Sequence, residues 1–131
     1  MLYSIHNQEL RVLISDLGAE LQSIQRIDGL EYLWQGDPQY WEGRAPIIFP
    51  YVAQLTEDTY LYHGIRYHMP IHGFASKSTF QVEQSSDARL VFSLIPDEAI
   101  SSLYPFDFVF QVVYTLNDSR IAVEYLSLIH I

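Results

Sequence analysis

The sequence has no cysteine and few basic residues. The lack of cysteine excludes a disulfide framework and a thiolate metal site. Only 7 lysine and arginine residues stand against 16 aspartate and glutamate residues, which gives a formal net charge of −9. This acidity argues against a nucleic-acid partner, because phosphate backbones are bound by clusters of basic side chains. An uncharged or cationic small ligand fits this charge better.

Long apolar runs are also missing. No run reaches the roughly 18 apolar residues needed to cross a bilayer. The first ten residues, MLYSIHNQEL, lack the basic and apolar parts of a signal peptide. The sequence therefore predicts a soluble, cytoplasmic protein that does not associate with membranes.

Short runs rich in β-branched and aromatic residues make up most of the chain. With 49% hydrophobic residues, 131 residues are enough for one packed domain. Turn residues separate the runs at regular spacing, which predicts about ten antiparallel strands in an all-β sandwich or barrel. The predicted strands and hairpins cover residues 10–15, 21–27, 30–34, 47–49, 59–68, 79–84, 89–94, 106–116 and 120–125. Only residues 38–42, with Asp37 as N-cap, and 97–103 are predicted to form helical turns.

The segment from Gly43 to Phe74 is the strongest candidate for a functional site. His72 stands between Pro70 and Gly73, where a sharply turning and rigid backbone suits an imidazole that points into a pocket. Pro70 and Gly73 also prevent the helix on which His68 and His72 would converge on a metal ion, so we expect no zinc site.

Several motifs together resemble the aldose 1-epimerase (galactose mutarotase) family, in its LacX-like branch. They are Trp34-Gln35-Gly36, the run from Arg44 to Pro50, Tyr60…Gly64…Tyr67, His72-Gly73-Phe74-Ala75 and the run from Tyr104 to Phe108. The resemblance implies an antiparallel β-supersandwich. It also implies cofactor-free interconversion of the α and β anomers of an aldose. Family members are about twice this length, so the resemblance places this chain in the N-terminal half of the fold.

The resemblance also implies roles for individual residues. The catalytic glutamate base and histidine acid of the family lie in its C-terminal half, so we expect no catalytic residue in this chain. His72 matches a histidine that binds the sugar. Gln54 stands where the family has an arginine, and it keeps hydrogen bonding without the charge or the fork of guanidinium. Arg44 is the remaining cation near the motif and a further candidate for binding.

The sequence leaves two roles open for each of its two tryptophans. Trp34 and Trp41 either stack on the apolar face of a sugar ring or fill the core. Trp41 is the better candidate for the sugar, because it precedes Arg44 on a loop. The sequence thus predicts a sugar or sugar phosphate as ligand, bound by His72, Gln54, Arg44 and Trp41. The alternative is a non-catalytic carbohydrate-binding β-sandwich protein, for which Gln54 is the available indication.

The end of the chain differs from the rest. Residues 1–126 are predicted to form the N-terminal part of the sandwich domain. Residues 127–131, SLIHI, resemble a read-through of a sequencing-library adaptor, which predicts a non-native tail; the alternative is an ordinary last strand. Half a sandwich is also expected to leave strand edges open and to expose apolar groups such as Phe106, Phe108 and Phe110 or their neighbours, which favours self-association.

Overall fold

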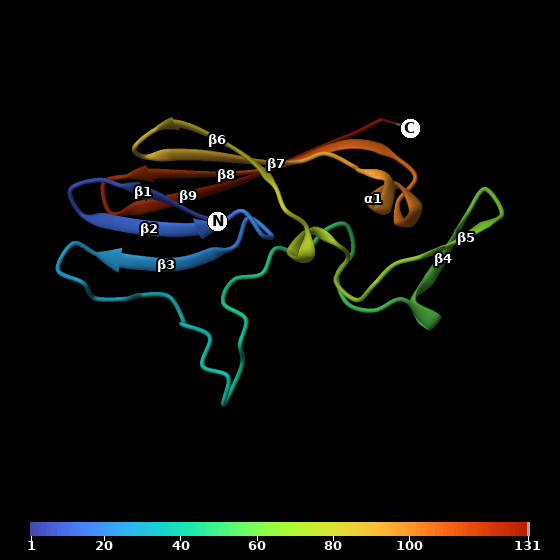
Figure 1. Cartoon of the computed structure of the whole chain (residues 1–131), viewed down its shortest axis with the longest axis horizontal. Helices are drawn as coiled ribbons and strands as arrows, with labels where there is room; N and C mark the ends of the chain where they lie inside the picture. Colours follow the sequence, from blue (N-terminus) through green and yellow to red (C-terminus); the bar gives the residue numbers. More distant parts are fainter. Residues whose placement is uncertain (131) are drawn as a thin grey trace.

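A computed structural model describes residues 1–130 and shows an almost entirely antiparallel β structure (Figure 1). Within these residues the chain forms nine strands and one short α-helix, α1 (Glu98–Leu103). None of the described helices has the length and hydropathy to cross a bilayer. The strands are β1 (Leu2–His6), β2 (Leu10–Ser15), β3 (Leu21–Arg26), β4 (Thr59–Tyr62), β5 (Ile65–His68), β6 (Gln81–Ser86), β7 (Arg89–Leu94), β8 (Asp107–Asn117) and β9 (Arg120–His130).

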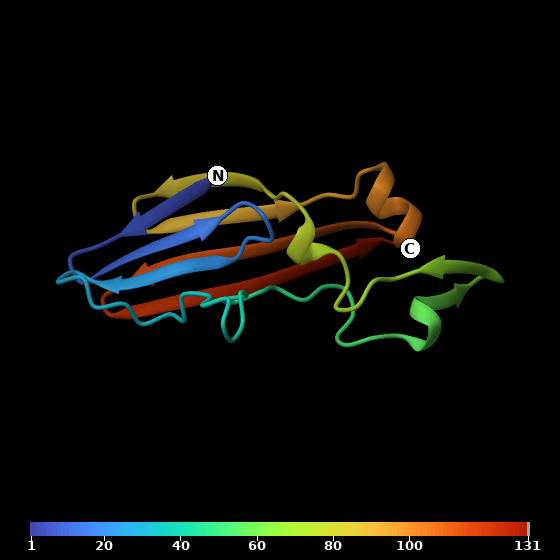
Figure 2. The same ribbon diagram turned by 60° about the horizontal axis from the view of Figure 1, so that its bottom comes forward.

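Two of the sheets form a sandwich (Figure 2). One has the order β1-β2-β3 and the other β6-β7-β8-β9, while β4 and β5 form a separate hairpin that projects from one end. In β2, Val12 and Ile14 are buried while Arg11 is exposed, so the predicted alternation is confirmed. The core draws on both sheets, with Ile5, Val12, Ile14, Leu90, Phe92, Val112 and Tyr114 at its centre.

A buried hydrogen bond joins the two sheets. The Tyr114 hydroxyl in β8 donates to the carbonyl oxygen of Ala19, which follows β2, at 2.7 Å. Burial raises the pKa of Tyr114, so the phenol keeps the proton that it donates. Because the two residues are far apart in the sequence, this bond fixes how one sheet lies on the other.

The phenylalanines of β8 are covered, contrary to the sequence-based expectation. Phe108 and Phe110 are only 2% and 4% exposed, so the prediction that they face water is wrong. Phe49 stacks on Phe110 with ring centroids 4.2 Å apart, and Phe74 also packs against Phe108. The segments before and after the β4–β5 hairpin fold back over this end of the sheet and bury it.

Two predicted strands are absent from the described residues. Residues 30–34 make only an isolated bridge, from Glu31 to Gln25, because the Glu31 carboxylate accepts the Leu33 N–H and turns the chain away. Residues 47–49 make only the bridge of Phe49 to Gly73, since the prolines on both sides lack the N–H groups that a ladder needs.

Helix α1, the turn at residues 37–41 and strand β9 lie where the sequence predicted a helical turn, a single turn and a strand. Asp97 caps α1, where its Oδ1 accepts the Ile100 N–H at 2.8 Å. At 37–41 the Asp37 carbonyl accepts the N–H groups of Tyr40 and Trp41, which forms the predicted single turn. Strand β9 continues to His130 and pairs with β8 along its whole length. Whether residues 127–131 are native stays a prediction, and residue 131 lies outside the described residues.

Strand β9 forms one open edge of the larger sheet. It pairs with β8 on one side and with no strand among residues 1–130 on the other. Leu126 and Leu128 on this strand are 48% and 64% exposed. Unpaired backbone groups together with apolar side chains make an edge that pairs readily with another chain.

We therefore expect the chain to self-associate through β9. Its average mass in sedimentation or light-scattering experiments should rise with concentration. The double substitution Leu126→Lys and Leu128→Lys should shift the chain toward monomer, because charges on an edge strand oppose pairing. Leu61→Lys, at an exposed leucine of β4, is the matched control and should leave the mass unchanged. A wild-type chain that stays monomeric at every concentration would contradict this expectation.

Candidate functional site

The His72-Gly73-Phe74 motif is docked against the backbone of Phe49. The Phe49 carbonyl accepts the N–H groups of Phe74 at 3.0 Å and Ala75 at 3.3 Å. Gly73 lies so close to Phe49 that a Cβ at this position would stand 2.1 Å from the Phe49 carbonyl oxygen. Only glycine fits here, and its backbone, with φ of +77°, lies in the left-handed region.

His72 holds the loop of residues 50–55 through two reciprocal hydrogen bonds. Its backbone N–H donates to the Ala53 carbonyl, and its Nδ1 accepts the Ala53 N–H, both at 3.0 Å. Because an amide N–H can only donate, Nδ1 must be the unprotonated nitrogen of a neutral imidazole. The ring proton is therefore on Nε2, and the exposed side chain offers a hydrogen-bond donor to a ligand.

Gln54 directly follows Ala53 in the chain, so its backbone lies next to the contact between Ala53 and His72. Its side chain is exposed, and its amide Nε2 donates to Asp58 Oδ1 at 2.8 Å. Within residues 1–130 the Gln54 Oε1 accepts no hydrogen bond from another side chain or amide. The structure thus places two of the predicted residues, His72 and Gln54, on segments that the contact of His72 with Ala53 joins.

The Arg44 side chain is engaged in hydrogen bonds within the protein. Its guanidinium donates to the Gln22 carbonyl at 2.6 Å and to Gln35 Oε1 at 2.8 Å, which ties the loop to β3. The neighbouring Trp41 is exposed, and its ring lies over Gly43, where a Cβ would stand 2.4 Å from the indole. Among the described residues no hydrogen bond or ring contact joins Arg44 or Trp41 to His72.

Glu31 forms hydrogen bonds with β3 and with Gln35, the partner of Arg44. Its carboxylate accepts the Ser23 hydroxyl at 2.6 Å, the Ile24 N–H at 2.8 Å and the Gln35 amide at 3.2 Å. Burial raises the pKa of Glu31, but these hydrogen bonds outweigh burial, so its pKa lies below the ordinary value of 4.5. Arg44, Gln35 and Glu31 therefore form one chain of contacts along β3.

We expect Glu31→Gln to lower the free energy of unfolding by about 1–2 kcal/mol at pH 7, because hydrogen bonds to the charged carboxylate are lost. A carboxyl group with a lowered pKa stabilises the fold above its ordinary pKa, and this contribution is lost as the pH falls through the lowered value. The difference between the two proteins in urea unfolding should thus shrink in acid. A difference that is the same at pH 7 and in acid would contradict this role.

A hollow walled by tyrosines lies beside the loop of residues 50–55, and it was not predicted. Its volume is about 310 Å³. The Tyr60 hydroxyl in its wall donates to the Leu103 carbonyl at 2.5 Å, and burial raises the pKa of Tyr60 to about 12. The available signal was the density of tyrosines near the β4–β5 hairpin. The hollow is lined by Pro50, Tyr51, Leu55, Tyr60, Met69 and Tyr104.

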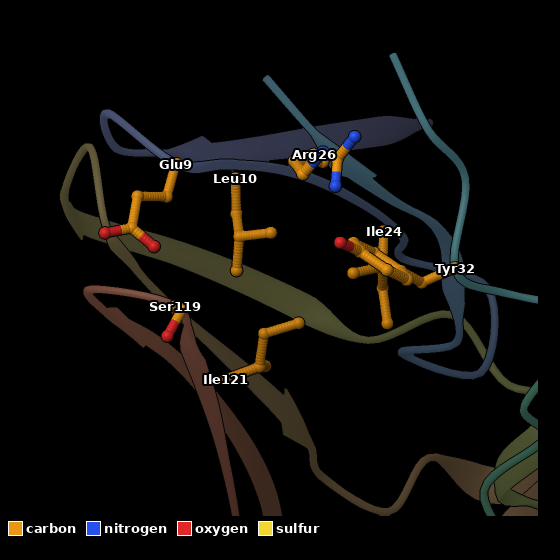
Figure 3. Close-up of a pocket in the computed structure, with 7 residues that line it drawn as sticks. All are labelled: Glu9, Leu10, Ile24, Arg26, Tyr32, Ser119 and Ile121. Carbon is orange, nitrogen blue, oxygen red and sulfur yellow. The ribbon is translucent and has the colours of Figure 1, made fainter. Parts of the chain in front are cut away.

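A second hollow, of about 480 Å³, lies elsewhere, between the edges of the two sheets (Figure 3). Its floor consists of Leu10, Ile24 and Ile121, which are sandwich residues of β2, β3 and β9. Arg26 on its rim is engaged in an ion pair with Asp28. None of the four predicted site residues lines this hollow, which marks the open side of the sandwich.

Comparison with known proteins identifies the family. The sequence profile of the aldose 1-epimerase family matches residues 1–128. The chain belongs to the aldose 1-epimerase family. The predicted resemblance is therefore confirmed, and so is the galactose mutarotase-like sandwich fold that it implied.

Individual relatives agree with this assignment. Protein LacX of Lactococcus lactis is 38% identical over an alignment that covers 95% of this chain and 44% of LacX. A galactose mutarotase related enzyme from Lactobacillus acidophilus superposes with a TM-score of 0.94 at 37% identity, covering 98% of this chain and 43% of that protein. A galactose mutarotase-like protein from Lactobacillus casei gives 0.92 at 33% identity, with 97% and 44% covered. This aldose 1-epimerase family chain thus spans less than half the length of these relatives.

Proposed function

We propose that the full protein to which this chain corresponds interconverts the α and β anomers of an aldose, and that this chain supplies part of the sugar-binding site. The observation that carries the proposal is the fixed tautomer of His72, whose exposed Nε2–H is available to a sugar oxygen. Gln54 Oε1 is an acceptor on the adjoining loop. Together the two side chains match a sugar hydroxyl, which both donates and accepts hydrogen bonds.

The reaction needs two further groups. A base removes the proton from the anomeric hydroxyl while an acid protonates the ring oxygen, so the bond between C1 and the ring oxygen breaks and C1 becomes an aldehyde. Rotation about the C1–C2 bond and closure on the other face then give the second anomer, with both protons returned. We assign neither group to this chain, and we expect the chain alone to bind sugar without turnover.

Arg44 and Trp41 take a supporting role in this proposal. The hydrogen bonds of Arg44 to Gln22 and Gln35 hold the loop that carries Trp41. Trp41 remains the candidate for stacking on a sugar face, because the residue is 52% exposed. The acidic charge of the chain favours a neutral aldose over a phosphorylated one.

Polarimetry tests the proposal. The protein made from the complete coding sequence should speed the approach of α-D-galactose or α-D-glucose to its equilibrium rotation, whereas this chain should match buffer. Galactose binding to this chain should be detectable by saturation-transfer NMR. Binding without any acceleration by the complete protein would instead support a non-catalytic carbohydrate-binding protein, and acceleration by the chain itself would show that the acid and base are within it.

A further inference from the structure

We infer that Asp58 is a positioning residue for the proposed sugar site, and that it decides which end of the Gln54 amide faces the ligand. The inference rests on the proposed function, in which Gln54 contacts the sugar. It adds a residue that the sequence motifs do not include. It also assigns the Gln54 position to ligand groups that donate a hydrogen bond, such as hydroxyl groups.

The bond between the two side chains allows one orientation of the amide. Gln54 Nε2 donates to Asp58 Oδ1 at 2.8 Å. A carboxylate accepts hydrogen bonds and has none to donate, so the NH₂ end of the Gln54 amide must face Asp58. The other end, Oε1, then remains for a ligand. A ligand at Gln54 therefore meets an oxygen acceptor backed by a negative charge, which suits a hydroxyl group and disfavours a phosphate or a carboxylate.

The backbone of Asp58 is held from two sides. Its N–H donates to the Leu55 carbonyl at 3.0 Å, and its carbonyl accepts the Met69 N–H at 2.8 Å. The first bond closes a turn that begins directly after Gln54, and the second ties this turn to the residue that follows β5. The main chain thus fixes the place of the carboxylate, and the carboxylate in turn holds the Gln54 side chain.

The conformation of Asp58 permits a substitution that does not strain the fold. Its φ is +56°, in the left-handed region that glycine adopts most readily. Asp58→Gly therefore removes the carboxylate while both bonds of the main chain remain. Glu57 is the matched control, because it has the same φ of +56° and carries the adjacent carboxylate. Its carboxylate lies 3.9 Å from the Arg66 guanidinium and, among the described residues, makes no hydrogen bond to Gln54.

The test is a double-mutant cycle on Gln54 and Asp58, with D-galactose titrated into this chain by NMR. Asp58→Gly should weaken galactose binding about three- to tenfold, because binding must then order a mobile Gln54 side chain. Gln54→Ala should weaken it at least as much. In the Gln54→Ala background, Asp58→Gly should cause no further loss, because Asp58 acts through Gln54. Glu57→Gly should stay within about twofold of the unsubstituted chain.

The side-chain amide of Gln54 gives a second measurement, which needs no sugar. In the ¹⁵N-labelled chain, relaxation of this NH₂ group should report a rigid side chain. The same group should become mobile in Asp58→Gly and stay rigid in Glu57→Gly. An amide that is equally rigid with and without the Asp58 carboxylate would overturn the inference.

The outcomes of the titrations separate the inference from the proposed function. Unchanged galactose affinity in Asp58→Gly, or the same loss with and without the Gln54 side chain, would overturn the inference and leave the proposed function intact. Equal losses in Asp58→Gly and Glu57→Gly would do the same. If Gln54→Ala left galactose binding unchanged, or if the unsubstituted chain bound no galactose, the proposed role of Gln54 would fail together with the inference.

Discussion

Replacing Gly73 by alanine is expected to lower the free energy of unfolding by about 2–5 kcal/mol, or to prevent folding. The added Cβ would stand 2.1 Å from the Phe49 carbonyl oxygen and 2.7 Å from the Pro50 nitrogen, both backbone atoms that cannot rotate away. Overpacking of this kind typically costs about 1–3 kcal/mol, and a left-handed backbone costs a non-glycine residue about 1–2 kcal/mol more. Urea unfolding followed by circular dichroism measures the loss.

Gly64 provides a control with the same backbone and no contact. Its φ is +75°, close to that of Gly73, but no atom lies within 4 Å of an added Cβ. Gly64→Ala should therefore lose only the backbone contribution of about 1–2 kcal/mol. Equal losses in the two variants would show that the close approach to Phe49 does not matter.

Replacing His72 is expected to have the largest effect on sugar binding. His72→Ala should weaken galactose binding about tenfold or more, because it removes the Nε2–H donor and also frees the loop that carries Gln54. The loop can be observed independently. The Ala53 amide donates to Nδ1, so its hydrogen exchange should speed up when the imidazole is removed.

His72→Asn separates the two roles. Asparagine tolerates the left-handed backbone of residue 72, where φ is +62°, and its Oδ1 can replace Nδ1 as acceptor of the Ala53 N–H. It has no donor at the position of Nε2. We expect slow exchange of Ala53 to be retained while galactose binding is lost. If the His72→Asn variant bound galactose as tightly as the unsubstituted protein, donation by Nε2 would be disproved. If the exchange rate of the Ala53 amide were unchanged in His72→Ala, the loop contact would be disproved.

Local patterns predicted most of the strands correctly. The alternation in β2 and the turn between β8 and β9 depend on neighbouring residues, so the sequence alone is sufficient there. The burial of Phe110 was missed, because it requires knowing that Phe49, about sixty residues earlier, stacks on it. Residues 30–34 were predicted wrongly because a carboxylate, rather than a neighbouring strand, accepts the N–H group of Leu33.

The site was predictable only in part. The motif singled out His72, whose role in sugar binding stays a prediction, and its neighbour Gly73 explains why the backbone turns there. The bond from Ala53 to His72, the commitment of Arg44 to Gln22 and Gln35, and the tyrosine-walled hollow all depend on contacts between distant segments. No periodicity or spacing encodes such contacts, so they could not be predicted from one sequence.

The long irregular segment between β3 and Thr56 has a consequence for how such proteins diverge. This fully described stretch contains no strand or helix, and side chains such as Glu20, which accepts the N–H groups of Arg44 and Ala45, set its course. A single substitution such as one at Glu20 can therefore change its course, whereas a substitution among the buried residues of the sandwich leaves a cavity or a clash. Descendants of a common ancestor can acquire new ligand preferences here by single point changes while inheriting the same scaffold.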